Sequence, residues 1–306
     1  MTALAAAIQV VGGLALAPLL PGTIQSLKAR LQGRRGPSPL QPYWELRRLW
    51  GKTLADPWPT TIVYRLAPCL AAAATALALL LLPIAGLAPA WSLGNDALVL
   101  VGLLALARFA LAASSWDTGS GFSLMGSSRD LTLSTFAEAL LLLAIVLAAL
   151  PAGSTDLVAM AAAANGSAPW GEPAHWCAAG AFALVVLVET GRQPIDNPDT
   201  HLELTMIHEG PLLEYAGRDL ALLEWTAAAR HWIVLVLGTE LFLPHWGGFG
   251  PQLACLAAGV AFLCLALALT ETAQAKMRIL RVPALLAGGC LLALVGLTSA
   301  LTGGLA

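Results

Sequence analysis

Acidic side chains are concentrated in residues 189–219, which hold seven of the chain's eighteen aspartates and glutamates. They are Glu189, Asp196, Asp199, Glu203, Glu209, Glu214 and Asp219. Apolar residues such as Leu202, Leu204 and Ile207 lie among them, and a fully solvated acidic loop would not need such neighbours. We therefore expect the segment to fold back against helices and to place carboxylates in a partly desolvated cavity, where burial favours proton uptake.

Ionisable residues also interrupt the long apolar stretches. They are Arg108, Glu138, Glu224, Arg230, Glu240 and, near the end of a stretch, Glu271. A charge at the centre of a bilayer costs roughly 2.5–3.5 kcal/mol on insertion scales, so such residues usually face the interior of a helix bundle, where they pair or titrate. One interpretation is an interhelical salt bridge, such as Arg108 with Glu138. Taken together, the residues favour a path for protons or other ions.

The sequence offers no clear set of metal or redox ligands. No two of the five cysteines form a Cys-x-x-Cys pair, and most lie in or beside apolar stretches, as small buried residues do. His201 and His208 would share one helix face, but a third clear ligand is missing. We expect the chain alone to bind no metal and no cofactor, and any redox centre to belong to another subunit.

The composition requires a lipid environment. Of the 306 residues, 58% are hydrophobic and 11% charged, and the mean hydropathy is +0.76, whereas a soluble domain is roughly a quarter charged. We therefore predict an all-α polytopic membrane helix bundle that forms one integral membrane domain over residues 1–306. The net charge of −2 and the lack of a basic face exclude a nucleic-acid partner.

About eight spans of roughly 20 apolar residues are predicted. Their ranges are 3–22, 66–89, 96–115, 131–151, 174–190, 219–243, 252–271 and 283–304, of which the fifth is short. Lysines and arginines outside the spans all fall in the first, third, fifth and seventh loops. Because short basic loops stay cytoplasmic, both termini are predicted to face outside, in agreement with an even number of spans.

The first predicted cytoplasmic loop, residues 23–65, contains an amphipathic stretch. Tyr43, Leu46, Trp50 and Leu54 recur at helical spacing with basic residues between them. This pattern predicts an interfacial helix that lies in the lipid headgroup layer. The alternative is a solvated basic loop that only sets topology.

Motifs in the acidic segment resemble those of a known family. Residues 189–196 read E-T-G-R-Q-P-I-D, followed by E-L at 203–204 and E-Y-A-G at 214–217. These resemble the E-x-x-R-x-P-F-D, E-L and E-Y-S-G motifs in the fifth loop of the respiratory complex I subunit-1 family. Residues 33–42 and 125–129 are similar to the first and third loops of that family.

Departures from the pattern favour one branch of the family. Ile195 and Ala216 replace the usual phenylalanine and serine, and residues 196–209 look more like the membrane subunit of group-4 nickel–iron hydrogenases, the hydrogenase-4 and formate hydrogenlyase type. In the family, this subunit anchors a cytoplasmic electron-transfer arm to the membrane arm, and its acids begin a proton path.

The resemblance implies roles for particular residues. Matching positions place four residues in a cavity beneath the docked arm, namely Arg192, Asp196, Glu203 and Glu214. The next acid, Glu224, would continue from this cavity inward. No motif contains the intramembrane candidates. They are proposed only because a charged side chain is costly to bury in the bilayer, and they are Arg108, Glu138, Arg230 and Glu240.

The implied partners are hydrogenase-like large and small subunits of a cytoplasmic arm, antiporter-like membrane subunits and the lipid bilayer. Iron–sulfur clusters and a nickel–iron centre would lie in partner subunits only, and a quinone at the interface is doubtful in the hydrogenase branch. The membrane would be a bacterial or archaeal cytoplasmic (inner) membrane.

The sequence thus predicts a non-catalytic anchor and coupling subunit that starts the movement of protons or Na⁺. The alternatives are the quinone-chamber subunit of an NADH:quinone oxidoreductase, a stand-alone ion-coupled secondary transporter and a purely structural anchor.

Overall fold

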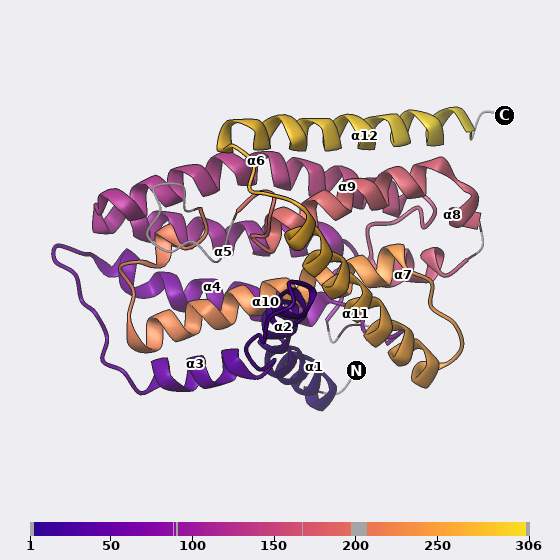
Figure 1. Ribbon diagram of the computed structural model, residues 1–306. Coiled ribbons are helices and arrows are strands. Elements are labelled where there is room, and N and C mark those ends of the chain that lie inside the picture. The colour runs from indigo at the N-terminus through magenta and orange to yellow at the C-terminus, as the bar shows by residue number, and fades with distance from the viewer. Residues whose placement is uncertain (1–2, 88, 90, 167, 197–206, 304–306) are drawn as a thin grey trace.

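The computed structural model describes residues 3–87, 89, 91–166, 168–196 and 207–303, and this part of the chain is built from helices without a β-strand (Figure 1). In chain order the helices are α1 (Ala3–Leu16), α2 (Leu19–Leu31), α3 (Gln41–Trp50), α4 (Ile62–Leu81), α5 (Asp96–Thr118), α6 (Gly121–Ala149), α7 (Leu157–Ala164), α8 (Ala168–Gly171), α9 (Pro173–Glu189), the 3-10 turn η1 (Gly210–Leu212), α10 (Gly217–Phe242), α11 (Phe249–Ala273), the 3-10 turn η2 (Ile279–Arg281) and α12 (Val282–Gly303). The predicted all-α class is confirmed.

Within the described ranges, seven helical stretches are long and apolar enough to cross a membrane. They are Gln9–Leu31, Ile62–Leu81, Asp96–Thr118, Gly121–Ala149, Gly217–Phe242, Phe249–Ala273 and Ile279–Thr302. The predicted fifth span corresponds to α9, which is apolar but has 17 residues. All eight predicted spans are therefore helical, although several of their limits differ from the prediction.

The first predicted span ends too early. The helix continues from residue 22 to Leu31, so the first loop does not begin at residue 23. Lys28 belongs to α2 and is 5% exposed, because its ammonium group lies 3.7 Å from the Glu271 carboxylate of α11. A hydropathy window stops at such a charge, whereas the folded chain neutralises it.

The fourth predicted span begins too late for the same reason. Helix α6 starts at Gly121, ten residues before the predicted limit of 131, and it includes Arg129 and Asp130, which were assigned to a loop. Asp130 faces the guanidinium of Arg108 on α5 at 3.7 Å. This opposite charge allows the polar first turns of α6 to pack within the bundle.

The amphipathic stretch in the first loop is helical, but α3 ends at Trp50, so Leu54 lies outside it. The helix contacts α10 and α2, and the rings of Trp50 and Trp225 meet edge to face with centroids 6.3 Å apart. Trp44 is 57% exposed on the outer side. The stretch is therefore a packed element, and its position in the headgroup layer remains a prediction.

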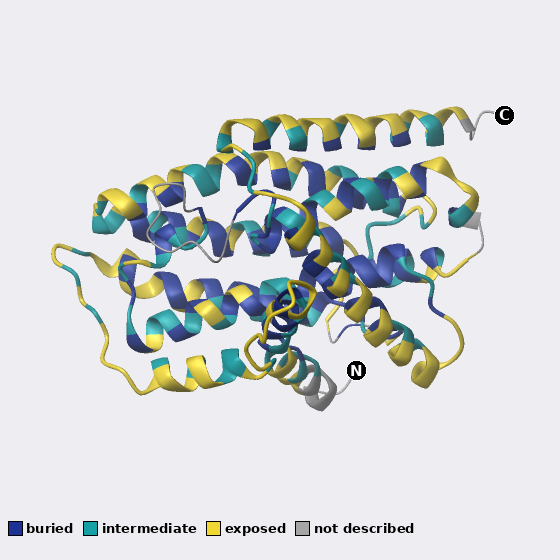
Figure 2. Ribbon diagram, viewed as in Figure 1, coloured by how far each residue is buried: buried dark blue, intermediate teal, exposed yellow. Residues whose placement is uncertain are grey.

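Helix packing explains the abundance of alanine. On α4, Ala67, Ala71, Ala74 and Ala78 recur every three or four residues and are buried, which lets α4 and α5 approach closely. Helix α10 crosses the middle of the bundle, and every residue from 233 to 242 is buried (Figure 2). A helix that is covered on all sides in this way fixes the positions of the polar residues that it carries.

The described parts of the acidic segment fold back onto the bundle, as predicted. Ile195 and Ile207 are fully buried. The rings of Tyr215 and Tyr64 stack at 4.4 Å, and each hydroxyl donates a hydrogen bond to a backbone carbonyl near the other residue: Tyr64 to Glu214 at 2.8 Å, and Tyr215 to Tyr64 at 3.0 Å. These contacts attach the end of the segment to α4.

Candidate functional site

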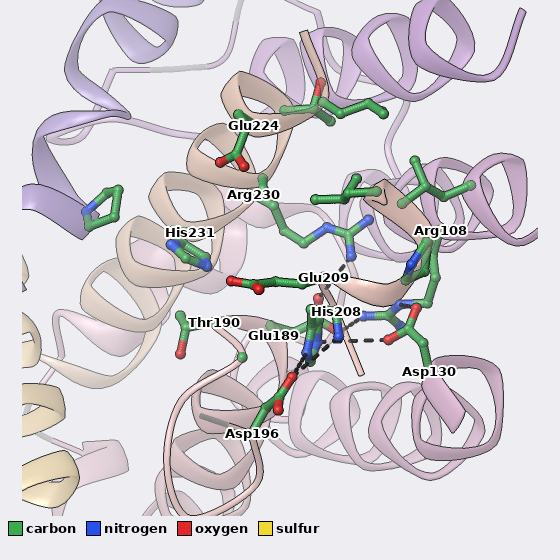
Figure 3. A pocket seen from close by; sticks show the side chains of 18 of the residues that line it. Arg108, Asp130, Glu189, Thr190, Asp196, His208, Glu209, Glu224, Arg230 and His231 are labelled. Carbon is green, nitrogen blue, oxygen red and sulfur yellow. Dashed lines mark hydrogen bonds and ion pairs between the residues drawn. The ribbon is translucent and has the colours of Figure 1, made fainter. Parts of the chain in front are cut away.

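The described parts of the acidic segment line a cavity of about 530 Å³, together with α2, α3, α4, α5, α6, α9 and α10. Its charged and histidine lining residues are Glu45, Arg108, Asp130, Glu189, Arg192, Asp196, His208, Glu209, Glu224, Arg230 and His231. Figure 3 shows that the nine of these residues that it labels, all except Glu45 and Arg192, converge from several helices and from the acidic segment. Five of the nine predicted site residues line this cavity, namely Arg108, Arg192, Asp196, Glu224 and Arg230.

Arg108 is the centre of the charged network. Its guanidinium donates to Glu189 at 2.7 Å and to Glu138 at 3.1 Å, and its Nε lies 3.7 Å from Asp130. The Arg108 side chain is 4% exposed and that of Glu189 is 2% exposed. One arginine on α5 therefore holds carboxylates from α6 and α9, and the predicted salt bridge between Arg108 and Glu138 is part of a larger set.

The network continues from Glu189 into α10. Arg230 Nη1 lies 3.8 Å from Glu189 Oε2, and Arg230 Nη2 donates to the Leu104 carbonyl at 3.3 Å. Glu189 Oε2 is buried and has no hydrogen-bond partner within the described part of the chain. Glu189 thus lies between two guanidinium groups, with one oxygen bonded to Arg108 and the other nearest to Arg230.

His208 extends the network in the other direction. Its Nδ1 lies 3.1 Å from Asp196, and its Nε2 lies 3.7 Å from Asp130. Burial lowers the pKa of His208, but the hydrogen bond to Asp196 and the charges of Asp130 and Asp196 outweigh burial and raise this pKa above its usual value. Lys276, which follows α11, lies 3.3 Å from the other oxygen of Asp196.

A second buried cluster borders the cavity. Arg192 donates to both oxygens of Glu271 at 3.2 and 3.4 Å, and Lys28 approaches the same carboxylate. The backbone amide of Met277 donates to the Pro194 carbonyl at 2.8 Å. The start of the acidic segment is thereby attached to α2, to the end of α11 and to the following loop.

The remaining predicted residues lie elsewhere. Glu138 contacts Arg108 but does not line the cavity. Glu214 does not line it either, and its backbone carbonyl accepts the Tyr64 hydroxyl. Glu240 lies ten residues beyond Arg230 on α10, about 15 Å along the helix, where its carboxylate accepts the backbone amide of Ala85 at 2.8 Å. Glu203 lies outside the described residues.

Sequence reasoning missed several cavity residues. The predicted span limits place Asp130 in a loop, His208 is a candidate only as a metal ligand, and no pattern points to His231. Glu189 and Glu271 were noted as acids, but their arginine partners are 81 and 79 residues away in the chain. Spacing along the sequence could not have found these pairs. In the described part of the chain, no group of three or more His, Cys, Asp or Glu residues could hold a metal ion.

Residues 4–300 match the protein family described as NADH dehydrogenase. The chain belongs to this family. The match confirms the resemblance that the motifs of the acidic segment indicated.

Two relatives come from Escherichia coli (strain K12). Hydrogenase-4 component C is 34% identical over 245 residues, which cover 79% of this chain and 76% of that protein. Formate hydrogenlyase subunit 4 is 32% identical over 280 residues, covering 89% and 86%. An NADH-quinone oxidoreductase subunit of Cereibacter sphaeroides is 28% identical over 225 residues, covering 71% and 70%. The predicted kinship with hydrogenase-4 and formate hydrogenlyase subunits is confirmed.

A solved archaeal respiratory membrane complex, the membrane-bound sulfane sulfur reductase, contains a chain of the same fold. The TM-score is 0.82 at 20% identity, over 97% of this chain and 98% of that one. Together with the apolar helices, the relatives identify the chain as a multi-pass membrane protein related to subunits of respiratory complexes.

Proposed function

We propose that this chain is the membrane-anchor and coupling subunit of a hydrogenase-4-like complex. The cytoplasmic electron-transfer arm docks over the acidic segment, and the charges of the cavity beneath it begin the path of protons or Na⁺. Higher identity to the hydrogenase-4 and formate hydrogenlyase proteins than to the NADH-quinone oxidoreductase relative supports this branch of the family.

The single observation that carries the coupling role is the continuity of the charged network. Arg230, Glu189, Arg108, Asp130 and His208 follow one another at 2.7–3.8 Å, and Asp196 and Lys276 continue the series. Charges at such distances interact strongly where the dielectric constant is low. A change of charge in the docked arm would therefore alter proton affinities along the whole series.

The proposed partners follow from the same assignment. Hydrogenase-like large and small subunits carry the iron–sulfur clusters and the nickel–iron centre, and antiporter-like membrane subunits carry the ions across. The chain itself does no redox chemistry. Its basic loops face the cytoplasm of a bacterial or archaeal cell, and both termini lie outside the cytoplasmic membrane.

A quinone-chamber role is the second candidate, because the cavity volume of about 530 Å³ falls in the range of small-molecule sites. The cavity also reaches Pro21 and Gln25 on α2 and Glu45 on α3. A stand-alone transporter is disfavoured, since the relatives are named as components or subunits of larger enzymes.

Purification of the native complex through a tag on this chain tests the proposal. We expect hydrogenase-like subunits to copurify and the complex to evolve or oxidise hydrogen without added quinone. Recovery of an NADH-oxidising arm, or activity that requires a quinone, would favour the second candidate. A chain that remains alone after gentle solubilisation and still moves ions would contradict both.

A further inference from the structure

A second cavity, of about 490 Å³, lies between α2 and α11, with Trp232 of α10 among its lining residues. It shares no lining residue with the charged cavity. On α2, Leu16, Leu20, Thr23, Leu27 and Arg30 follow one another every three or four residues, counting Leu16 at the end of α1. The cavity is therefore a groove that runs along one face of the helix.

The facing wall is a matching stripe on α11. Leu253, Ala257, Val260 and Cys264 line it at the same helical spacing. Ala257 is exposed to the groove, and its small side chain leaves the space open. The two stripes are almost wholly apolar, as are the surfaces that membrane helices present to lipid.

Arg30 is the one charged residue among the lining residues, and it lies at the end of α2. It has no side-chain hydrogen bond or ion pair with any residue that the structure describes. Lys28, two residues earlier, turns away and is paired with Glu271. The two basic residues of this helix end therefore differ: one is neutralised within the protein, and the other is available at the end of an apolar groove.

We propose that this groove binds one phospholipid, with an acyl chain between α2 and α11 and the anionic headgroup phosphate at Arg30. From Leu19 to Arg30, α2 extends about 17 Å, which matches the roughly 15 Å depth of one hydrocarbon leaflet. A guanidinium binds a phosphate through two parallel hydrogen bonds, and basic pockets between membrane helices select anionic headgroups. The inference does not depend on the proposed coupling role.

The end of the groove near Arg30 is closed on one side, which favours one stably bound lipid over lipids that exchange rapidly. Pro39 lines the groove, and the segment before α3 packs so tightly on α2 that a Cβ at Gly36 would lie 2.5 Å from the Cβ of Ala29, the residue before Arg30. A fixed wall beside Arg30 would hold one headgroup in place.

Native mass spectrometry of the intact complex tests the proposal, with palmitoyl-oleoyl phosphatidylglycerol and phosphatidylethanolamine as probes. Wild type should retain one phosphatidylglycerol per chain after detergent washing. Ala261→Trp fills the groove and should abolish retention. Ala258→Trp adds the same bulk at an exposed position on α11 that does not line the groove, and it should retain the lipid.

The Arg30→Gln variant tests the headgroup without adding bulk, at an exposed position that should not disturb folding. It should weaken phosphatidylglycerol retention roughly fivefold, the factor for one basic residue near an anionic surface, and remove the preference over phosphatidylethanolamine. Equal retention by Ala261→Trp and Ala258→Trp, an unchanged preference in Arg30→Gln, or recovery of an isoprenoid quinone from the groove would overturn the proposal.

Discussion

Arg108 contacts three carboxylates on two other helices, a geometry that a planar guanidinium supports better than an ammonium group. Replacing Arg108 by Gln would leave the buried Glu189 with only the more distant guanidinium of Arg230. Breaking such a buried pair costs about 3–5 kcal/mol, so we expect a clearly lower thermal unfolding temperature of the purified complex.

The exposed pair of Arg65 and Asp56 provides the control. Their side chains are 65% and 63% exposed, and their charged groups lie 2.9 Å apart. Arg65→Gln should cost less than about 1 kcal/mol, since solvent screens such pairs. Similar unfolding temperatures for Arg108→Gln and Arg65→Gln would mean that the buried network does not stabilise the bundle.

His208 makes the docking of the acidic segment sensitive to pH. Its pKa is raised in the folded chain, because Asp196 and Asp130 outweigh the opposing effects of burial and of Arg108. Its stabilising contribution is therefore complete below the unfolded pKa of about 6.5 and is lost as pH rises through the higher folded pKa. Amide protection factors at residues 207–212 should fall as pH increases from about 6 to about 9.

His208→Gln supplies the comparison, because it keeps a polar side chain that cannot become charged. Its protection factors should be lower at the acidic end and should change little with pH. A wild-type segment whose protection is flat over the same range would show that His208 is neutral in the folded protein.

The cost of burying charge identified Arg108 and Arg230 correctly as bundle residues, although no motif contains them. The same reasoning also selected Glu240, which satisfies the Ala85 amide far along α10 from the cavity. Burial cost depends on depth in the bilayer and says nothing about the direction of a side chain. A single sequence therefore does not predict which residues pair with a buried charge.

At the scale of elements, the cavity depends on a close approach between α6 and η1. A Cβ at Gly126 would lie 2.7 Å from the Gly210 Cα and 3.0 Å from Pro211. Gly126→Ala should push η1 away from α6 and destabilise the complex by about 1–3 kcal/mol, the usual range for overpacking. Limited proteolysis should then cut the acidic segment faster than in wild type.

Gly102→Ala is the matched control, because a Cβ at that position of α5 would meet no atom within 4 Å. It should leave the proteolysis rate unchanged. If Gly126→Ala is as resistant as Gly102→Ala, the contact between α6 and η1 does not hold the segment in place. This contact also gives a physical reason for the glycine in the motif at residues 125–129.

The sequence predicts that each of these helices exists, but it predicts less accurately the residues at which they begin and end. Apolar windows located the seven helices that are long enough to cross a membrane and the shorter apolar helix α9, because hydrocarbon imposes a minimum length. They failed at Lys28 and Asp130, where charged residues extend α2 and α6 because a distant residue neutralises each charge. The limits of these helices are set by tertiary pairing rather than by local composition.

At the scale of the whole molecule, the bundle, its family and the folding back of the acidic segment followed from hydropathy, charge and motifs. A cavity under this segment followed as well, but most of its lining residues did not, since residues from seven helices meet only in the fold. Loop motifs supplied Arg192 and Asp196, and burial cost supplied Arg108 and Arg230. The two methods identified different residues of the same cavity.

The number of protons moved per electron in proteoliposomes that contain the intact complex tests the central claim most directly. Glu224 lines the cavity from α10, and Glu172 is an exposed acid before α9 that does not line it. In Glu224→Gln, electron transfer should continue while proton movement falls to a small fraction of wild type, and Glu172→Gln should match wild type. An unchanged ratio of protons to electrons in Glu224→Gln and in Asp196→Asn would contradict the account.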